Sequence, residues 1–332
     1  MIRASAPIRI CDNGGWTDTW FGGPGRVLNI AVTPGVEVAV RRTDGPDRVV
    51  LDVQAFGDRY PLVPGAPRGT RHPLLESAID AFPPPEDLAV EISVRAAAPP
   101  GCGTGTSAAV SVALLGALAA LRSDRPSPRD IAYAAHRLEV DTLGIQSGIQ
   151  DQLCAALGGI NYIEVEPYPE AVVHALPPWD GLDARLSLVF LGRAHNSSDL
   201  HRQVIQGLGQ REAAVFSRLR DAATAARDAV LARDLGAFGR AMADNTEAQR
   251  SLHPGLVGVD ADRVVEWAEA HGALGWKVNG AGGDGGSVTI LSATRADRDA
   301  VGPAIAGLDP RYRKIPVRVS TTGCEVRGSL DT

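Results

Sequence analysis

The segment from residue 99 to residue 107 has the composition of a phosphate-binding loop. Three glycines alternate in it with other residues, at Gly101, Gly103 and Gly105. The hydroxyls of Thr106 and Ser107 follow at once, where they can bond phosphate oxygen or a magnesium ion. A tight turn without a ligand is an equal alternative on the glycines alone, because the segment has neither a Walker A ending nor the Rossmann glycine spacing.

A second glycine-rich segment, residues 280–286, lies between two short apolar runs. Five adjacent or nearly adjacent glycines let a backbone approach another group closely. The alternative is a flexible hairpin with its turn at Asp284-Gly285.

The elements around these loops must position them. Alternation over residues 88–95 predicts a strand that enters the first loop, and the Ala-rich run that begins at residue 108 predicts a helix that leaves it. Backbone N–H groups therefore converge beside the positive end of a helix dipole, as phosphate binding requires. Helices are also expected over 126–141, with Glu139 near its end, and over 147–156, with Asp151.

The remaining pattern predicts strands near the start of the chain and a mostly helical second half. Strands are expected over 8–11, 36–41, 49–53, 160–165, 171–176, 185–191, 276–278, 286–291 and 315–319. Further helices are expected over 198–208, 211–232, 235–251, 254–271 and 295–306. The proline-rich stretch 61–73 is expected to be a surface loop. We place a domain boundary at residue 170, which gives domains 1–170 and 171–332.

The composition is that of a folded protein and excludes several classes. The chain has 332 residues, 44% hydrophobic and 22% charged, with 37 Gly and 23 Pro, which excludes disorder and collagen. The net charge is −6 and the basic residues are scattered, so no nucleic acid is expected as a partner. No apolar run approaches the ~18–20 residues of a membrane span, and the first residues do not resemble a signal peptide. We expect a cytoplasmic monomer or homodimer that does not bind membranes.

Three segments, in this order, resemble the three motifs of the GHMP small-molecule kinases: RICDNGGWTD (9–18), PPGCGTGTSAA (99–109) and KVNGAGGDGG (277–286). The resemblance covers nearly the whole chain. The heptose 7-phosphate kinase and fucokinase branch is the most similar, since GGWTD (14–18), GIQDQ (148–152) and GGIN (158–161) resemble its patterns. The implied fold is α+β, with an N-terminal domain like ribosomal protein S5, a C-terminal ferredoxin-like domain and a cleft between them.

The resemblance also implies catalytic roles. Asp151 matches the residue that accepts the proton of the sugar hydroxyl, and Arg9 matches the residue that pairs with it. The guanidinium would keep the carboxylate ionised. Ser107 and Glu139 match the two magnesium ligands, and oxygen ligands suit that hard cation.

The binding residues follow in the same way. The expected nucleotide and phosphate contacts are Pro100, Gly101, Gly103, Thr104, Gly105, Thr106, Ser107 and Ala108. The expected substrate contacts are Gly15, Trp16, Asp18, Gln150, His195, Gly282 and Gly283. The adenine pocket is suspected among residues 55–71.

The implied reaction is direct transfer of the γ-phosphoryl group from ATP, with Mg²⁺, to the hydroxyl of a sugar or sugar phosphate, with the anomeric hydroxyl preferred. A heptose 7-phosphate is the first candidate acceptor. The alternatives are a free sugar, as in fucokinases, or a non-catalytic sugar-binding homologue. A phosphate on the acceptor would need a basic pocket, for which Arg193, His195 and Arg202 are the candidates.

Three positions depart from the family pattern. Thr104 and Thr106 replace the usual Leu and Ser, and Asp284 stands where Gly is common. Thr106 preserves a hydroxyl. The carboxylate of Asp284 would weaken phosphate binding unless it points away or meets the metal.

Overall fold

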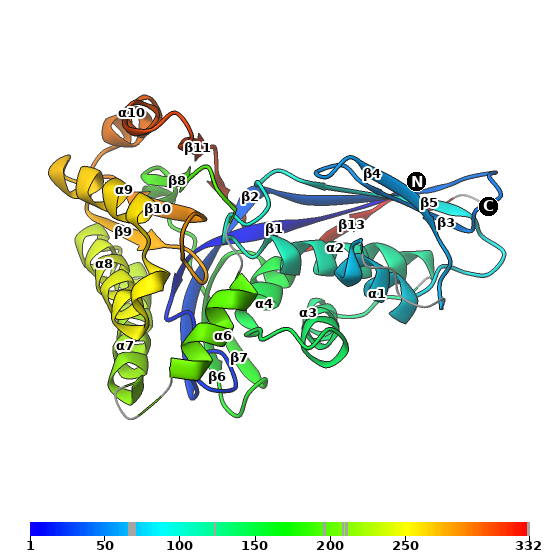
Figure 1. The fold of residues 1–332 in the computed structure, drawn as a ribbon, viewed down its shortest axis with the longest axis horizontal. Helices are drawn as coiled ribbons and strands as arrows, with labels where there is room; N and C mark the ends of the chain where they lie inside the picture. Colours follow the sequence, from blue (N-terminus) through cyan, green and yellow to red (C-terminus); the bar gives the residue numbers. More distant parts are fainter. Residues whose placement is uncertain (66–70, 123, 195–196, 208, 210–211, 331–332) are drawn as a thin grey trace.

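Two sheets organise the residues that the computed structural model describes, which are 1–65, 71–122, 124–194, 197–207, 209 and 212–330 (Figure 1). The larger, nine-stranded sheet contains β1 (Ile2–Asn13), β2 (Gly25–Arg42), β3 (Val49–Val53), β4 (Asp58–Leu62), β5 (Val90–Ala96), β6 (Ile160–Val165), β7 (Ala171–Leu176), β12 (Arg318–Val319) and β13 (Glu325–Arg327). The smaller sheet has the order β11-β8-β10-β9, with bounds β8 (Leu186–Phe190), β9 (Gly275–Val278), β10 (Ser287–Leu291) and β11 (Arg313–Ile315).

Helices pack beside both sheets, and we call each sheet with its helices a lobe. The helices beside the larger sheet are α1 (Pro73–Ala81), α2 (Thr106–Leu121), α3 (Pro128–Arg137) and α4 (Gln150–Leu157). The others are α5 (Asp180–Asp183), α6 (Ser197–Gly207), α7 (Glu212–Ala232), α8 (Leu235–Leu252), α9 (Val259–Ala270) and α10 (Arg295–Leu308). Figure 1 shows α8, α9 and α10 around the smaller sheet, at the opposite end of the molecule from α1 and α3, and α7 lies between α8 and strands β1, β2 and β7 of the larger sheet. The predicted α+β class is confirmed.

Strand β1 lies where the two lobes meet. It pairs antiparallel with β2, and its residues from Ala6 to Asn13 are all buried, because α2 and α4 from one lobe and α7, α8 and β9 from the other contact it. A strand covered in this way carries its polar side chains into the interior. Arg9 and Asp12 are therefore buried.

Helix α2 is apolar on all sides and lies against β1, β2, α3 and α4. Its N-cap is Gly105, which has a left-handed backbone and supplies no side-chain cap. The first N–H groups of this helix therefore remain available to a ligand.

Several elements differ from the sequence prediction. The stretch expected to be a surface loop contains the end of β4 and leads into α1, and β2 begins at Gly25, well before the expected strand. The helix expected over 126–141 ends at Arg137 and continues as a π-helical turn, Leu138–Thr142, which holds Glu139. A 3₁₀ turn, Pro254–Leu256, precedes α9.

The division at residue 170 stays a prediction. The strands that follow it do not all belong to the smaller sheet, because β7 pairs with β6, β12 with β2 and β13 with β1. In the part of the chain that the structure describes, no helix is both long enough and apolar enough to cross a membrane.

Candidate active site

A cavity of about 580 Å³ brings together residues from distant parts of the chain. Its walls include the loop before α2, the turn after β1, the start of α4 and the beginning of the second glycine-rich loop. Four acidic side chains and one guanidinium line it, from Asp12, Asp18, Glu139, Asp151 and Arg9.

The loop before α2 has the alternating left-handed glycines that are typical of the backbone nests that bind anions, and we call it the nest. Gly101, Gly103 and Gly105 have φ of 68°, 75° and 66°, so left-handed residues alternate with others and successive N–H groups turn toward a common point. The loop also packs tightly, because a Cβ on Gly105 would lie 3.1 Å from the carboxylate of Asp151. A second contact fixes it from the other lobe, where the Ser287 hydroxyl donates to Cys102 O at 2.7 Å.

Asp151 and Arg9 form a bidentate ion pair at the wall of the cavity. Arg9 Nε lies 2.7 Å from Asp151 Oδ1 and Nη2 lies 3.1 Å from Oδ2. The third nitrogen, Nη1, donates to Gly103 O of the nest. Burial opposes the charge of Arg9, but Asp12 and Asp151 outweigh it and raise the pKa of Arg9 overall. The pair therefore fixes the Asp151 carboxylate, 25% exposed, beside the nest.

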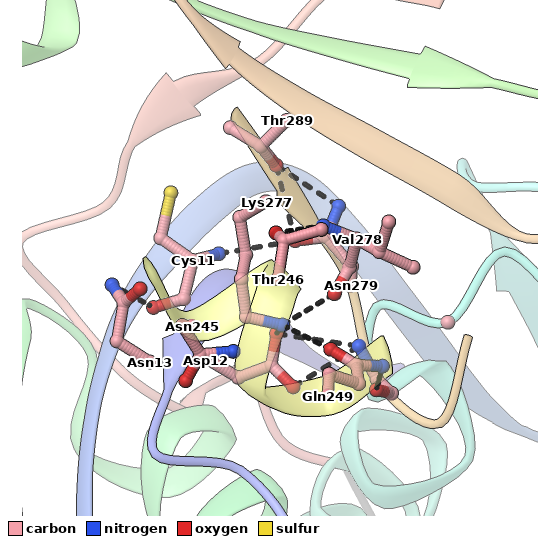
Figure 2. Close-up of polar contacts among 12 residues, drawn as sticks. Cys11, Asp12, Asn13, Asn245, Thr246, Gln249, Lys277, Val278, Asn279 and Thr289 are labelled. Atoms are coloured by element: carbon pink, nitrogen blue, oxygen red, sulfur yellow. Dashed lines mark hydrogen bonds and ion pairs between the residues drawn. The ribbon is translucent and has the colours of Figure 1, made fainter. Parts of the chain in front are cut away.

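Behind this pair lies a second, sealed ion pair that joins the lobes (Figure 2). Lys277 Nζ of β9 is 3.3 Å from Asp12 Oδ1 of β1, and their side chains are 1% and 2% exposed. Lys277 also donates to Gln249 Oε1 at 3.1 Å, and Gly280 N donates to Asp12 Oδ2 at 3.0 Å. Burial lowers the pKa of Lys277, which Asp12 partly offsets. Since Asp12 is 3.9 Å from Arg9, the charges alternate from Asp151 to Lys277.

Further hydrogen bonds brace the two lobes at the same place. Cys11 N donates to Asn279 Oδ1 at 3.2 Å, and Gly14 N donates to Asn245 Oδ1 at 2.6 Å. The second glycine-rich loop thus reaches the nest, because a Cβ on Gly280 would lie 2.7 Å from Gly103 O.

Glu139 and Ser107 provide oxygen atoms suited to a cation. Glu139 Oε2 accepts from Gln152 Nε2 at 2.9 Å, whereas its buried Oε1 has no hydrogen-bond partner among the described residues. Burial raises the pKa of Glu139 to about 7, which a nearby cation would reverse. Ser107 is exposed at the first turn of α2 and lines the same cavity. These donors fit Mg²⁺ held between the protein and a phosphate.

The turn after β1 supplies the other wall. Trp16 has φ of 80°, a strained value for a residue with a side chain, and is held by the Thr17 hydroxyl, which bonds Gly14 O at 2.7 Å. Asp18 is 2% exposed and its Oδ2 accepts from Gln150 N at 3.0 Å. Burial raises the pKa of Asp18 to about 7, and the charge of Asp151 adds to this shift.

Most residues expected at the site line the cavity. They are Arg9, Trp16, Asp18, Gly101, Gly103, Thr104, Gly105, Thr106, Ser107, Ala108, Glu139, Gln150 and Asp151. Pro100 lines a neighbouring apolar cavity. Gly15 lies just behind the wall, where its N–H donates to Asp12 O at 3.0 Å.

Gly282 and Gly283 do not line the cavity, contrary to expectation. Gly283 N donates to Leu256 O at 2.9 Å, and a Cβ on Gly282 would lie 1.8 Å from the same oxygen. The loop turns away toward the 3₁₀ segment, so Gly280 and Ala281 face the cavity instead.

The remaining candidates lie elsewhere. Asp284 is exposed and lies against Gly258, the N-cap of α9, so its carboxylate points away from the phosphate loop. Arg193 pairs with Asp260, and neither Arg193 nor Arg202 lines the cavity. His195 is outside the described residues.

The site residues that the sequence did not single out include six with polar or charged side chains: Asp12, Thr19, Gln146, Ser147, His201 and Lys277. Asp12 lies within the first motif and Lys277 opens the third, so their charges in otherwise apolar strands were the available signal. Gln146, Ser147 and His201 had none, because a loop and an amphipathic helix commonly carry such residues on the surface.

Family models match the two halves of the chain separately. The model for the GHMP kinases N terminal domain matches residues 74–159, and the model for the GHMP kinases C terminal domain matches residues 226–307. The chain belongs to the GHMP kinase superfamily.

Named relatives of this GHMP kinase differ in substrate. The D-glycero-alpha-D-manno-heptose 7-phosphate kinase of Campylobacter jejuni is 24% identical over 59% of this chain, and the match spans only 60% of that protein's length. The mevalonate kinase of Methanothermobacter thermautotrophicus is 30% identical over 61% of this chain and 63% of its own. A crystal structure of a D-glycero-D-manno-heptose 1-phosphate kinase from Bacteroides thetaiotaomicron shares the fold, with a TM-score of 0.77, 21% identity and 100% of both chains covered.

Proposed function

We propose that this GHMP kinase transfers the γ-phosphoryl group of ATP to a hydroxyl of a sugar or sugar phosphate. The observation that carries the proposal is the ionised Asp151–Arg9 pair beside a nest of backbone N–H groups. Phosphoryl transfer requires these two parts, a phosphate cradle and a group that orients the hydroxyl and receives its proton. The heptose kinase relatives favour a sugar acceptor, and the mevalonate kinase relatives are the competing indication.

The nucleotide would lie across two adjoining cavities. The neighbouring cavity, of about 300 Å³, shares Leu74, Gly101, Thr106 and Ser107 with the active-site cavity. Its other walls are mostly apolar and include Phe56, 60% exposed, whose ring centroid lies 5.2 Å from that of His72. A flat base fits such a surface while the phosphates reach the nest.

Each residue then has a separate task in the transfer. The N–H groups of the nest and of the first turn of α2 bind the β- and γ-phosphates. Asp151 accepts a hydrogen bond from the attacking hydroxyl and takes its proton as the bond to phosphorus forms, and Arg9 keeps that carboxylate ionised and oriented. Ser107 and Glu139 would hold Mg²⁺, which neutralises phosphate charge when bound.

Acceptor-dependent release of ADP tests the proposal. The purified protein is incubated with ATP and Mg²⁺ and a panel of free hexoses, free heptoses, their phosphates and mevalonate, and the phosphorylated hydroxyl is identified by ³¹P NMR. We expect at least one sugar or sugar phosphate to gain a phosphate. Phosphorylation of mevalonate alone, or no acceptor-dependent ADP release at all, would contradict the proposal.

A further inference from the structure

The cavity that holds Asp151 has one wall that belongs neither to the phosphate loop nor to the ion pairs. It comes from the turn after β1, the segment before and at the start of α4, and helix α6. Its members are Trp16, Asp18, Thr19, Gln146, Ser147, Gln150 and His201. We call these seven residues the acceptor wall.

The acceptor wall offers the groups that recognise hydroxyls. Its polar side chains are carboxylate, amide, hydroxyl and imidazole, which together can donate and accept hydrogen bonds. The rings of Trp16 and His201 lie edge to face at 4.7 Å. Trp16 Nε1–H is buried and has no hydrogen-bond partner among the described residues. An indole of this kind suits a sugar, since its ring packs on C–H groups and its N–H can donate to a hydroxyl.

The same wall lacks a cation to pair with an anionic acceptor. Among the described residues that line the cavity, Arg9 is the sole lysine or arginine, and all three of its nitrogens are bonded to Asp151 or Gly103 O. His201 Nδ1 lies 2.6 Å from the backbone oxygen of Gln146, and burial lowers the pKa of this imidazole. Burial therefore disfavours a positive charge on His201.

Carboxyl groups, rather than cations, line this region. Asp18 and Asp151 both line the cavity, and the charge of Asp151 contributes to the raised pKa of Asp18. The two arginines once expected to form a basic pocket lie elsewhere, since neither Arg193 nor Arg202 lines the cavity. A phosphate or carboxylate on the acceptor would find no available cation among the described residues of this cavity, because Arg9 is already engaged by Asp151 and Gly103 O.

From this juxtaposition we infer that the acceptor is an uncharged sugar that carries neither phosphate nor carboxylate. The inference rests on the proposed function and narrows it, from sugars and sugar phosphates to free sugars. Its physical basis is that an anion bound at this wall without a cationic partner is held far more weakly than a neutral polyol of the same shape.

The test compares matched acceptors on the full-length protein with ATP and Mg²⁺. Free mannose, galactose and D-glycero-D-manno-heptose are each paired with the ester that carries phosphate on the terminal hydroxyl, and mevalonate is included. We expect kcat/KM for the best free sugar to exceed that for its ester by about 100-fold. An ester or mevalonate as the better acceptor would overturn the inference. Preference for an ester would leave the proposed function intact, whereas inactivity on every acceptor would refute both.

Two variants at Gln146 test whether charge is the cause. Gln146 lines the wall and its Oε1 accepts from Trp20 Nε1 at 2.5 Å, a bond that both variants lose. Gln146→Lys adds a cation, and we expect it to reduce the preference for the free sugar at least tenfold relative to Gln146→Met. An equal preference in the two variants would contradict the electrostatic basis.

A third variant addresses the histidine outside the described residues. His195→Ala is measured on the same pairs, and we expect the ratio of free sugar to ester to stay within about threefold of the wild-type value. If the wild-type protein uses an ester well and His195→Ala does not, His195 supplies the missing cation and the inference is wrong.

Discussion

Two ion pairs lie side by side where the lobes meet, and they differ in access to solvent. Asp151–Arg9 faces the cavity, and its carboxylate is 25% exposed. Asp12–Lys277 is almost completely buried, with side chains 2% and 1% exposed although Asp12 borders the cavity, and it ties β1 to β9. The two ion pairs therefore have different roles, although both join an aspartate to a basic residue. An accessible carboxylate can receive a proton from a substrate, whereas a sealed pair can contribute only to how the lobes are held.

The two pairs are nevertheless linked through Arg9. Its Nη2 is 3.1 Å from Asp151 and 3.9 Å from Asp12, so each carboxylate competes for the same guanidinium. Lys277 neutralises Asp12 and leaves Arg9 to Asp151. If access to solvent decides the role of each pair, a substitution in Asp151–Arg9 should abolish turnover, whereas a substitution in Asp12–Lys277 should chiefly lower the free energy of unfolding.

The largest expected effect is on turnover in Asp151→Asn. The amide keeps the shape but cannot take the proton, so we expect kcat to fall by about a thousandfold or more, with ATP affinity within a few-fold of wild type. Steady-state kinetics measures kcat, and titration with nucleotide measures the affinity for ATP. Turnover close to wild type would show that Asp151 is not the proton acceptor.

Lys277→Met should act on folding. It leaves the buried Asp12 carboxylate without its cation, and we expect the free energy of unfolding to fall by about 3–5 kcal/mol. Urea unfolding followed by circular dichroism provides the measurement. The matched control is the double variant Asp12→Asn/Lys277→Met, which removes both charges and should be more stable than Lys277→Met alone. A double variant that loses the sum of the two single effects would mean that the charges do not interact.

Gly103→Val probes the place where the two regions meet. Gly103 has φ of 75°, its carbonyl accepts from Arg9, and it lies against Gly280. A β-branched residue strains this backbone and turns the nest away from the phosphates, so we expect ATP affinity to fall by about 100-fold. Calorimetric titration with an ATP analogue measures it, and unchanged affinity would rule out this loop as the phosphate site.

The smallest expected effect is a pH dependence of stability from Asp18. The pKa of Asp18 in the folded protein is about 7, above its ordinary value of 3.8, because burial disfavours the charged form. The folded state therefore holds this proton at pH values where the unfolded state has lost it, and stability declines as pH rises through 7. Between pH 6 and pH 8 this group should cost about 1.4 kcal/mol, and Asp18→Asn should lack that contribution. Urea unfolding measures the free energy of unfolding of the wild type and of Asp18→Asn at pH 6 and pH 8. A change between the two pH values that is the same in both proteins would contradict the raised pKa of Asp18.

The loop before α2 could be placed from the sequence because local spacing determines it, whereas Asp151 was indicated by the resemblance to the GHMP kinases. Glycines at alternate positions before an Ala-rich run specify both the nest and the helix that follows. The Asp12–Lys277 pair could not be found in this way, because the two residues are 265 positions apart and only strand packing brings them together. The outward turn of Gly282 and Gly283 depends on a carbonyl of Leu256, which no local pattern indicates.

The predicted bounds of some elements were wrong for a related reason. Residues 73–81 follow a proline-rich stretch that is typical of a loop, yet they form α1, with Leu75, Ala78 and Ile79 buried in the main core. Tertiary burial outweighs the weak local signal there. The π-helical turn that holds Glu139 falls within the predicted α-helix, because the extra residue in a π-helical turn leaves the spacing of the apolar residues almost unchanged.

The larger sheet is not built from one continuous stretch of chain. After the smaller sheet is complete, β12 returns to pair with β2 and β13 with β1. Val319 N donates to Asp183 Oδ1 at 2.7 Å, so the returning chain is fastened to the segment that first left the larger sheet. During synthesis the strands that complete the first lobe therefore emerge after the second lobe, and the first lobe reaches its final form only when the second has already emerged.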